Sequence, residues 1–264
     1  MLDTAVRPWV ARIVRLGYLA KGLIYSLIGV LALRVALGMS GGRLTDPSGA
    51  LRTVLSQPFG RVMLAIIGIG IVGYAIYYIV DAAADLRHKG DDTRGWASRG
   101  VTMIKASVYG LIGVQALQVV FFNRRPTDRT EESAGKVMQF PMGEWLLIAV
   151  GLGMATYGIS QLIAAVRGGL DDGLNVSRIR REAPWVLSLG RFGIAARSVI
   201  IILVGTTLVR SGWRGRAADA DGIREALRTI ASFDPWLLTA IGAGLLSFGL
   251  YQLCKARYVK LAVS

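Results

Sequence analysis

Long apolar runs alternate with short polar, mostly basic segments along the whole chain. Four of these runs contain no charged residue: Val62–Val80, Ala106–Asn123, Trp145–Val166 and Pro235–Cys254. Each is close to the roughly 20 residues of α-helix that cross the hydrocarbon core of a bilayer. Two further runs, Gly22–Leu33 and Ser198–Val209, are long enough only if the neighbouring Lys21 and Arg197 lie inside the membrane boundary. The pattern therefore predicts an all-α integral membrane protein with six transmembrane helices.

The polar positions at the start of these runs recur at fixed intervals. A shift of 84 positions matches Arg15, Lys21, Tyr25 and Gly29 with Arg99, Lys105, Tyr109 and Gly113. A shift of 176 positions matches Arg15, Gly17, Lys21 and Arg34 with Arg191, Gly193, Arg197 and Arg210. The chain therefore reads as one membrane domain, 1–264, of three two-helix repeats at about 1–88, 89–176 and 177–264. Each repeat crosses the bilayer twice, so the repeats are expected to be parallel and related by a pseudo-threefold axis along the membrane normal.

Each repeat also contains a short amphipathic stretch and a small-residue helix face. The amphipathic stretches are expected to be short helices in the outer loops, capped by residues such as Asp46 and Asp221; they are Ala50–Val54, Ala134–Met138 and Ala226–Ile230. Small residues seven positions apart share a helix face and let helix backbones approach closely in lipid. These pairs are Gly22 and Gly29, Ala106 and Gly113, and Ser198 and Gly205.

The second helix of each repeat carries a Gly-x-Gly pair, then an aromatic residue and, one turn later, a polar one. The aromatic and polar positions form a stripe: Tyr74 and Tyr78, Tyr157 and Gln161, and Phe248 and Gln252. The stripe either packs between helices or lines a quinone- or lipid-sized pocket, and its helical spacing favours packing. The Gly-x-Gly pairs lie in mid-helix, without the strand and turn of a dinucleotide site, so they predict no nucleotide cofactor.

Three motifs connect the chain to a known family. They are Arg-x-Gly…Lys-Gly-x-x-Tyr-x-x-x-Gly at 15–29, Ala-Leu-Arg at 50–52 and Gln-Pro-Phe-Gly at 57–60. On these residues the chain resembles a bacterial family of membrane proteins, the domain-of-unknown-function 1206 family, whose members repeat a two-helix unit three times. The resemblance covers nearly the whole chain and implies a six-helix membrane protein, without an activity. The middle repeat departs most, with Val101 for Gly17 and Gln118 for Arg34.

Composition and charge agree with a membrane protein. Hydrophobic residues make up 53% of the chain, charged residues 18%, and the net charge is +14. More than half of the 31 basic residues fall on the side that holds both termini, and cytoplasmic loops collect Lys and Arg. The sequence therefore predicts a multi-pass protein of the bacterial inner membrane with both termini in the cytoplasm. This topology explains the charge without a nucleic-acid partner.

The residue inventory argues against an enzyme. One cysteine and one histidine exclude an intrachain disulfide, a bis-histidine haem site and a histidine-rich metal centre. No Ser/His/Asp set or phosphate-cradling loop is recognisable, so no catalytic residue, metal or cofactor is predicted. No acidic residue lies in the middle of an apolar run, which argues against proton-coupled transport. Asp81 and Glu144 stand at helix edges, where we expect them to be solvated or paired.

The repeated cations form the candidate functional site. Lys21, Lys105 and Arg197 occupy equivalent positions in parallel repeats, so we expect them at one depth, as a ring that attracts anions. Tyr25 and Tyr109 lie one turn further on and would extend a polar lining. The alternative is snorkelling, in which long basic side chains reach the lipid head groups from inside the helix end.

Two functions of different class follow from these features. The first is a non-enzymatic binding site, or a passive pathway, for small anions or anionic lipid head groups. The second is a structural scaffold that binds lipid or a partner membrane protein through its small-residue helix faces. Ile201 interrupts the tyrosine position in the third repeat, which weakens a strict ring and leaves both hypotheses open.

Overall fold

Every regular element in the described part of the chain is a helix. The computed structural model describes residues 6–84, 92–122, 130–168, 179 and 181–258. The long helices are α1 (Val6–Ala36), α3 (Gly60–Ala84), α4 (Thr93–Phe122), α6 (Gly143–Arg167), α8 (Trp185–Arg214) and α10 (Pro235–Tyr258). The short helices are α2 (Pro47–Leu55), α5 (Thr130–Met138), the 3-10 turn η1 (Ala217–Asp219) and α9 (Ile223–Phe233). The predicted all-α class is confirmed.

The long helices make this a multi-pass membrane protein. Five segments are long and apolar enough to cross a membrane: Val14–Ala36, Gly60–Ala83, Gly143–Arg167, Trp185–Arg214 and Pro235–Arg257. Helices α1 and α8 continue through Lys21 and Arg197, as the shorter apolar runs required. Helix α4 contains a shorter apolar stretch, Ala106–Phe122, so the sixth crossing stays a prediction.

The predicted amphipathic stretches form α2, α5 and α9, each beginning about one turn earlier than expected. Asp46 caps α2, because its carboxylate accepts hydrogen bonds from the backbone N–H groups of Ser48 (3.3 Å) and Gly49 (2.9 Å). Helix α9 begins without a side-chain cap. Asp221 instead lies 3.7 Å from Arg210, and burial raises the pKa of Asp221 although this cation acts to lower it.

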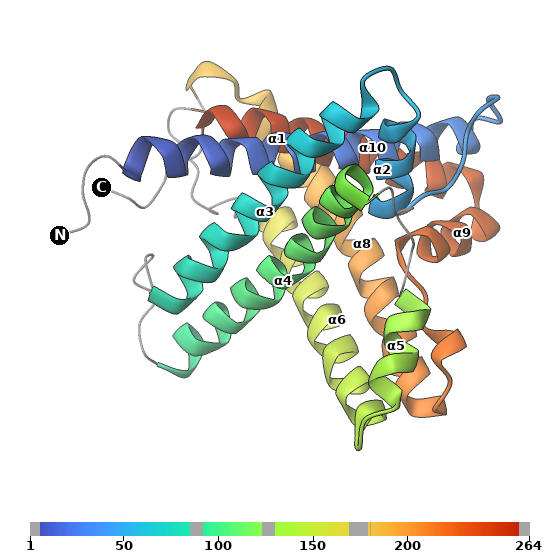
Figure 1. Ribbon diagram of the computed structural model, residues 1–264. Helices are drawn as coiled ribbons and strands as arrows, with labels where there is room; N and C mark the ends of the chain where they lie inside the picture. The colour runs from blue at the N-terminus through green and yellow to red at the C-terminus, as the bar shows by residue number, and fades with distance from the viewer. Residues whose placement is uncertain (1–5, 85–91, 123–129, 169–178, 180, 259–264) are drawn as a thin grey trace.

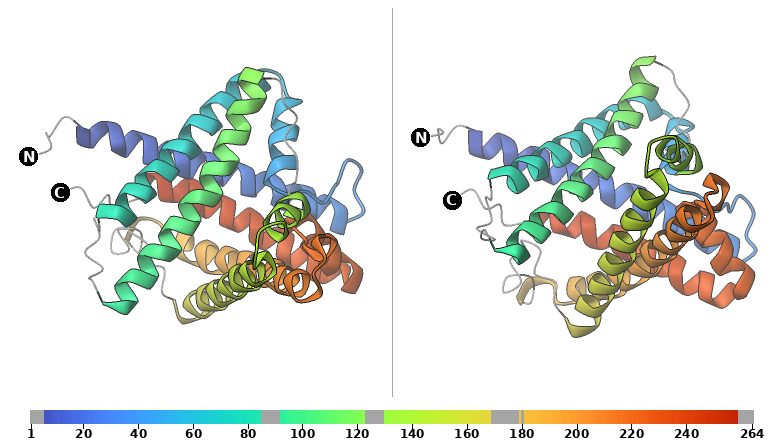
Figure 2. Two further views of the ribbon diagram at one scale, coloured as in Figure 1. Left: turned by 60° about the horizontal axis from the view of Figure 1, so that its bottom comes forward. Right: turned by 90° about the horizontal axis from the view of Figure 1, so that it is seen from below.

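The six long helices form three antiparallel pairs: α1 with α10, α3 with α4, and α6 with α8 (Figure 1). Figure 2 shows the same pairs from two other sides. Each pair joins the second helix of one repeat to the first helix of the next, and α10 of the last repeat joins back to α1. The most extensive helix–helix contacts in the described fold therefore lie between neighbouring repeats.

Small residues set the spacing within each pair. Gly29, Gly113 and Gly205 occupy one repeat position, and each faces the backbone of its partner helix. A Cβ added at Gly113 would lie 2.9 Å from the Val72 nitrogen, and one added at Gly205 would lie 2.7 Å from the Ala155 nitrogen. At Gly29 it would collide with the α10 backbone. The predicted small-residue face is thus a contact surface inside the fold.

Two of the repeated arginines bind the ends of neighbouring helices. Each guanidinium donates two hydrogen bonds of 2.7–3.1 Å to carbonyl oxygens near the end of the paired helix: Arg99 to Ala82 and Ala83, and Arg191 to Ala165 and Val166. The last four carbonyl groups of a helix lack intrahelical donors, and a cation is favourable beside them. This contact explains the recurring arginine at the start of the second and third repeats.

Candidate functional site

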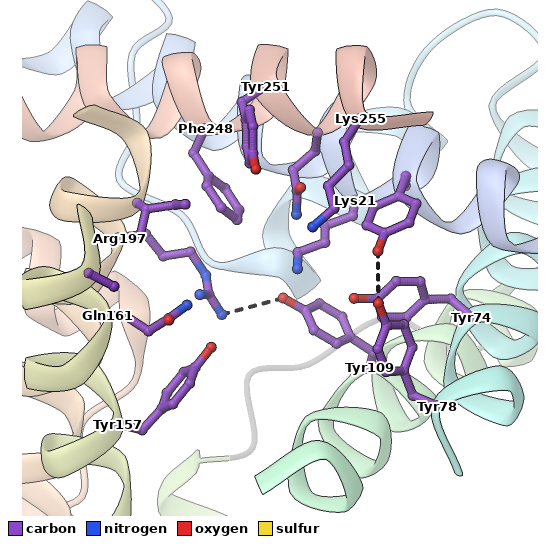
Figure 3. A pocket seen from close by; sticks show the side chains of 14 residues that line it. Lys21, Tyr74, Tyr78, Tyr109, Tyr157, Gln161, Arg197, Phe248, Tyr251 and Lys255 are labelled. Carbon is purple, nitrogen blue, oxygen red and sulfur yellow. Dashed lines mark hydrogen bonds between the residues drawn. The ribbon is translucent and has the colours of Figure 1, made fainter. Parts of the chain in front are cut away.

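The three helix pairs surround a central cavity of about 90 Å³, and all six long helices contribute side chains to it (Figure 3). Its polar lining is basic, phenolic and amide: Lys21, Arg197, Lys255, Tyr18, Tyr74, Tyr78, Tyr109, Tyr157, Tyr251, Gln161 and Gln252. Phe248, Ile194 and Ala164 complete the lining. A polar space of this size holds several water molecules or one small polar group.

Lys21 lies among aromatic rings. The residue is only 8% exposed, and its ammonium nitrogen lies 4.4 Å from the ring centre of Tyr109, 5.4 Å from Phe248 and 5.7 Å from Tyr74. An aromatic face within about 6 Å of a cation contributes roughly 0.5–2 kcal/mol, most where water is excluded. Lys21 therefore points into the helix bundle, which argues against snorkelling at this position.

Arg197 shares aromatic partners with Lys21. Its Nε donates to the Tyr25 hydroxyl (3.3 Å) and its Nη2 to the Tyr109 hydroxyl (3.4 Å), and its Cζ lies 5.1 Å from the Phe248 ring centre. Tyr109 thus contacts Lys21 through its ring and Arg197 through its hydroxyl group (Figure 3). Two cations that are distant in sequence are linked by one tyrosine.

Lys255 is a third cation in the cavity, and sequence reasoning missed it. Its ammonium nitrogen lies 5.2 Å from the ring centre of Tyr18 and 6.0 Å from that of Tyr251, and the residue is 6% exposed. A signal was present, because Lys255 follows Gln252 by three residues and so continues the stripe on α10.

The structure describes every residue of the predicted stripe but only part of the predicted cation ring. All six stripe residues line the cavity: Tyr74, Tyr78, Tyr157, Gln161, Phe248 and Gln252. Tyr109 lines it as well, whereas Tyr25 stands behind Arg197 and supports it. Lys105 lies on α4, but its side chain is outside the described part of the structure, so Lys21 and Arg197 are the two described members of the predicted ring.

Tyrosines form a connected cluster on one side of the cavity. The Tyr18 and Tyr78 hydroxyl oxygens are 2.7 Å apart and share a hydrogen bond. The Tyr74 ring lies edge-on to Tyr18 and Tyr109, with ring centres 5.3 and 5.4 Å apart, and it also contacts Tyr78. Such aromatic pairs contribute about 0.5–1.5 kcal/mol each beyond their buried area. The cluster therefore fixes hydroxyl groups around the cations.

The cavity carries a positive charge balance. Three of its described lining residues are basic and none of them is acidic. Asp81 follows Tyr78 by three residues on α3 and is only 3% exposed, so it is not a solvated carboxylate. Glu144, in contrast, is exposed. Even if the negative charge of Asp81 is included, the three positive charges of Lys21, Arg197 and Lys255 exceed it. No group of three potential metal-binding side chains occurs among the described residues.

Comparison with known proteins agrees with the three repeats. The family model described as Domain of Unknown Function (DUF1206) matches three times, at residues 16–85, 101–168 and 192–259. The "Uncharacterized protein YxxB" of Bacillus subtilis (strain 168) is 31% identical over 255 residues, which cover 96% of this chain and 92% of that protein. No solved structure matches the chain. The chain belongs to the family described as Domain of Unknown Function (DUF1206), whose repeat it contains three times.

Proposed function

We propose that the central cavity binds an anionic group, the phosphate or carboxylate of a small solute or of a lipid head group, without catalysing a reaction on it. The observation that carries the proposal is the convergence of Lys21, Arg197 and Lys255 from three helices on one small cavity, where none of the described lining residues is acidic. A bound anion would offset the repulsion between these cations.

The energetics of buried charge support an anion at this place. A Lys or Arg at the centre of a membrane helix costs at least about 2.5–3.5 kcal/mol, so such residues mark functional sites. The cation–π contacts offset part of that cost for each residue alone, but they do not reduce the mutual repulsion. Arg197 also offers a planar fork of donors, which suits carboxylate and phosphate oxygens, while each lysine acts as a point charge.

The proposal includes a membrane arrangement. Helix α4 has 30 residues, about 45 Å of helix, and is long enough to be a sixth crossing that takes Lys105 into the membrane. The equivalent contacts at Gly29, Gly113 and Gly205 support a pseudo-threefold arrangement of the repeats around the cavity. The distribution of basic residues supports a bacterial inner-membrane location with both termini in the cytoplasm.

Binding is better supported than a passive pathway or a scaffold. The cavity is small, and Lys21 and Lys255 are both nearly fully buried, which favours a held ligand over flow. The scaffold hypothesis relied on small-residue faces as docking surfaces for a partner. Gly29, Gly113 and Gly205 are instead covered by helices of the same chain.

The test compares wild type with the triple variant Lys21→Gln, Arg197→Gln, Lys255→Gln in detergent. The matched control removes the same charge at exposed sites: Arg34→Gln, Arg210→Gln and Arg228→Gln. Inorganic phosphate and phosphatidylglycerol are the probes, and thermal unfolding is the readout. A ligand at 100 times its Kd stabilises a protein by about 2.7 kcal/mol, so at least one probe should stabilise wild type and the control, but not the triple variant.

Two results would contradict the proposal. One is a wild-type protein that neither probe stabilises. The other is a folded triple variant that responds to the probes as strongly as the wild type does. Flux of phosphate into proteoliposomes, present in wild type and lost in the triple variant, would identify a pathway rather than a closed binding site.

A further inference from the structure

In the first and third repeats, the two helices of the repeat pack against each other at a glycine. A Cβ added at Gly70 on α3 would lie 3.0 Å from the carbonyl carbon of Leu16 on α1. One added at Gly244 on α10 would collide with the Cβ of Ala196 on α8. Gly70 and Gly244 are both the second glycine of a Gly-x-Gly pair. This position is therefore where the two helices of a repeat meet.

Gly153 holds the same position in the middle repeat, and the space beside it is open. Among the described residues, no atom would lie within 4 Å of a Cβ added at Gly153. In the described part of the chain, α4 packs on α2 and α3, and α6 packs on α5 and α8, with no extended contact between α4 and α6. Helix α6 is also the least buried of the five candidate spans. We call the space between α4 and α6 beside Gly153 the α4/α6 seam.

The sequence of the middle repeat departs from that of the other two repeats at this crossing. Gly17 on α1 faces the carbonyl oxygen of Gly70, and Gly193 on α8 faces the backbone of α10, so both crossings use glycine on the first helix. The middle repeat has Val101 at this position. Helix backbones approach closely in lipid only where small residues leave room, so the sequence at this position does not favour a close crossing of α4 and α6.

The seam adjoins both the cavity and the apolar surface of α6. Tyr109 from α4 and Tyr157 from α6 both line the cavity, and the hydroxyl groups of both point toward the Arg197 guanidinium (Figure 3). Gly153 lies one turn before Tyr157, and Val150 and Leu146 continue that face of the helix. These two side chains are 44% and 53% exposed. The seam thus has a cationic end at the cavity and an apolar wall along α6.

We infer that the α4/α6 seam admits an anionic phospholipid from the bilayer, with its phosphate in the cavity beside Lys21, Arg197 and Lys255 and an acyl chain along α6. This inference rests on the proposed function and names its ligand class. The cationic cavity matches a phosphate, and the apolar wall matches a chain that is tied to it. A water-soluble anion has no part that would occupy an apolar opening toward lipid.

Filling the seam tests the inference. Gly153→Leu adds a side chain to the open space one turn from Tyr157. Gly100→Leu is the matched control, because a Cβ at Gly100 also meets no atom within 4 Å, but Gly100 lies nine residues before Tyr109, on the opposite face of α4. Phosphatidylglycerol binding is measured by native mass spectrometry and phosphate binding by thermal shift. Gly153→Leu should bind phosphatidylglycerol about tenfold more weakly and bind phosphate as wild type does.

Val101→Gly is an independent variant that adds no side chain. It should let α4 approach α6 and weaken phosphatidylglycerol binding in the same direction, while Gly100→Leu leaves both probes unchanged. Phosphatidylglycerol bound at wild-type affinity by both seam variants would overturn the seam and leave the anion site standing. Phosphate binding without phosphatidylglycerol binding in wild type would overturn the lipid assignment alone. Wild type that binds neither probe would overturn the proposed function as well.

Discussion

At the scale of the residue, Lys21 combines a positive charge with near-complete burial in a membrane-spanning helix. Three aromatic rings within 6 Å of its ammonium nitrogen offset part of the cost of removing the charge from water. Arg197 and Lys255 line the same cavity and increase that cost, because like charges repel in a medium of low dielectric. In the absence of an anion, the charge of Lys21 should therefore destabilise the fold.

Replacement of Lys21 by methionine tests this balance. Met keeps the unbranched shape and the contacts with the rings but carries no charge. Lys21→Met should raise the stability of the anion-free protein by about 1 kcal/mol, which is roughly 2–4 °C in the unfolding temperature for a chain of this size, and should remove the stabilisation by phosphate. Thermal unfolding with and without phosphate measures both effects. Arg34→Met, an exposed site on the same helix, is the control, and a destabilised anion-free Lys21→Met would assign Lys21 a structural role.

The same residues show what could be predicted from the sequence. Lys21 and Arg197 were predictable, because each interrupts an apolar run at an equivalent place in two repeats. Lys255 was harder to predict: its spacing from Gln252 continues the stripe, but it follows the last uncharged run and so resembles a loop charge that sets topology. Only the packing of α10 beside Tyr18 brings its ammonium group into the cavity. Local spacing gives the face of a helix, and a neighbouring helix decides whether that face is covered.

At the scale of the element, glycine positions separate helices that touch from helices that do not. Gly29 on α1 and Gly153 on α6 are both helical glycines in apolar runs, and the residues around them do not show which of the two faces another helix. The first faces the α10 backbone, and the second faces open space. The sequence predicted the small-residue faces but did not predict which helices they join, because periodicity does not specify which helix lies opposite. In the structure, the most extensive helix pairs join neighbouring repeats.

Alanine at these two glycines should have opposite effects. Gly29→Ala forces a methyl group into the α1/α10 contact and should destabilise the protein by about 1–3 kcal/mol. The methyl group of Gly153→Ala would contact none of the described residues, and the substitution gains helix propensity, which is worth up to about 1 kcal/mol. Chemical denaturation in detergent compares both with wild type. Equal effects of the two substitutions would contradict the close contact at Gly29.

At the scale of the whole molecule, the helix pairs constrain the number of crossings. Helix α1 spans the membrane and packs antiparallel along α10, so the start of α1 and the end of α10 belong on the same side. Only an even number of membrane crossings between these two points returns the chain to the same side, so five crossings do not suffice. Helix α4, with 30 residues, is the long helix that remains. It has the length to cross, although only Ala106–Phe122 within it is continuously apolar.

Cysteine labelling on the two sides of α4 decides the crossing. Cys254→Ala removes the single native cysteine, after which Asp92→Cys marks the start of α4 and Ser133→Cys marks α5. Helix α5 packs against η1, which follows the span α8, so α5 and the end of α8 share one side. With both termini cytoplasmic, a membrane-impermeant maleimide should label Ser133→Cys in intact spheroplasts and Asp92→Cys only after permeabilisation. Labelling of both sites from the same side would show that α4 does not cross. Another part of the chain would then have to supply the sixth crossing that the α1/α10 pair requires.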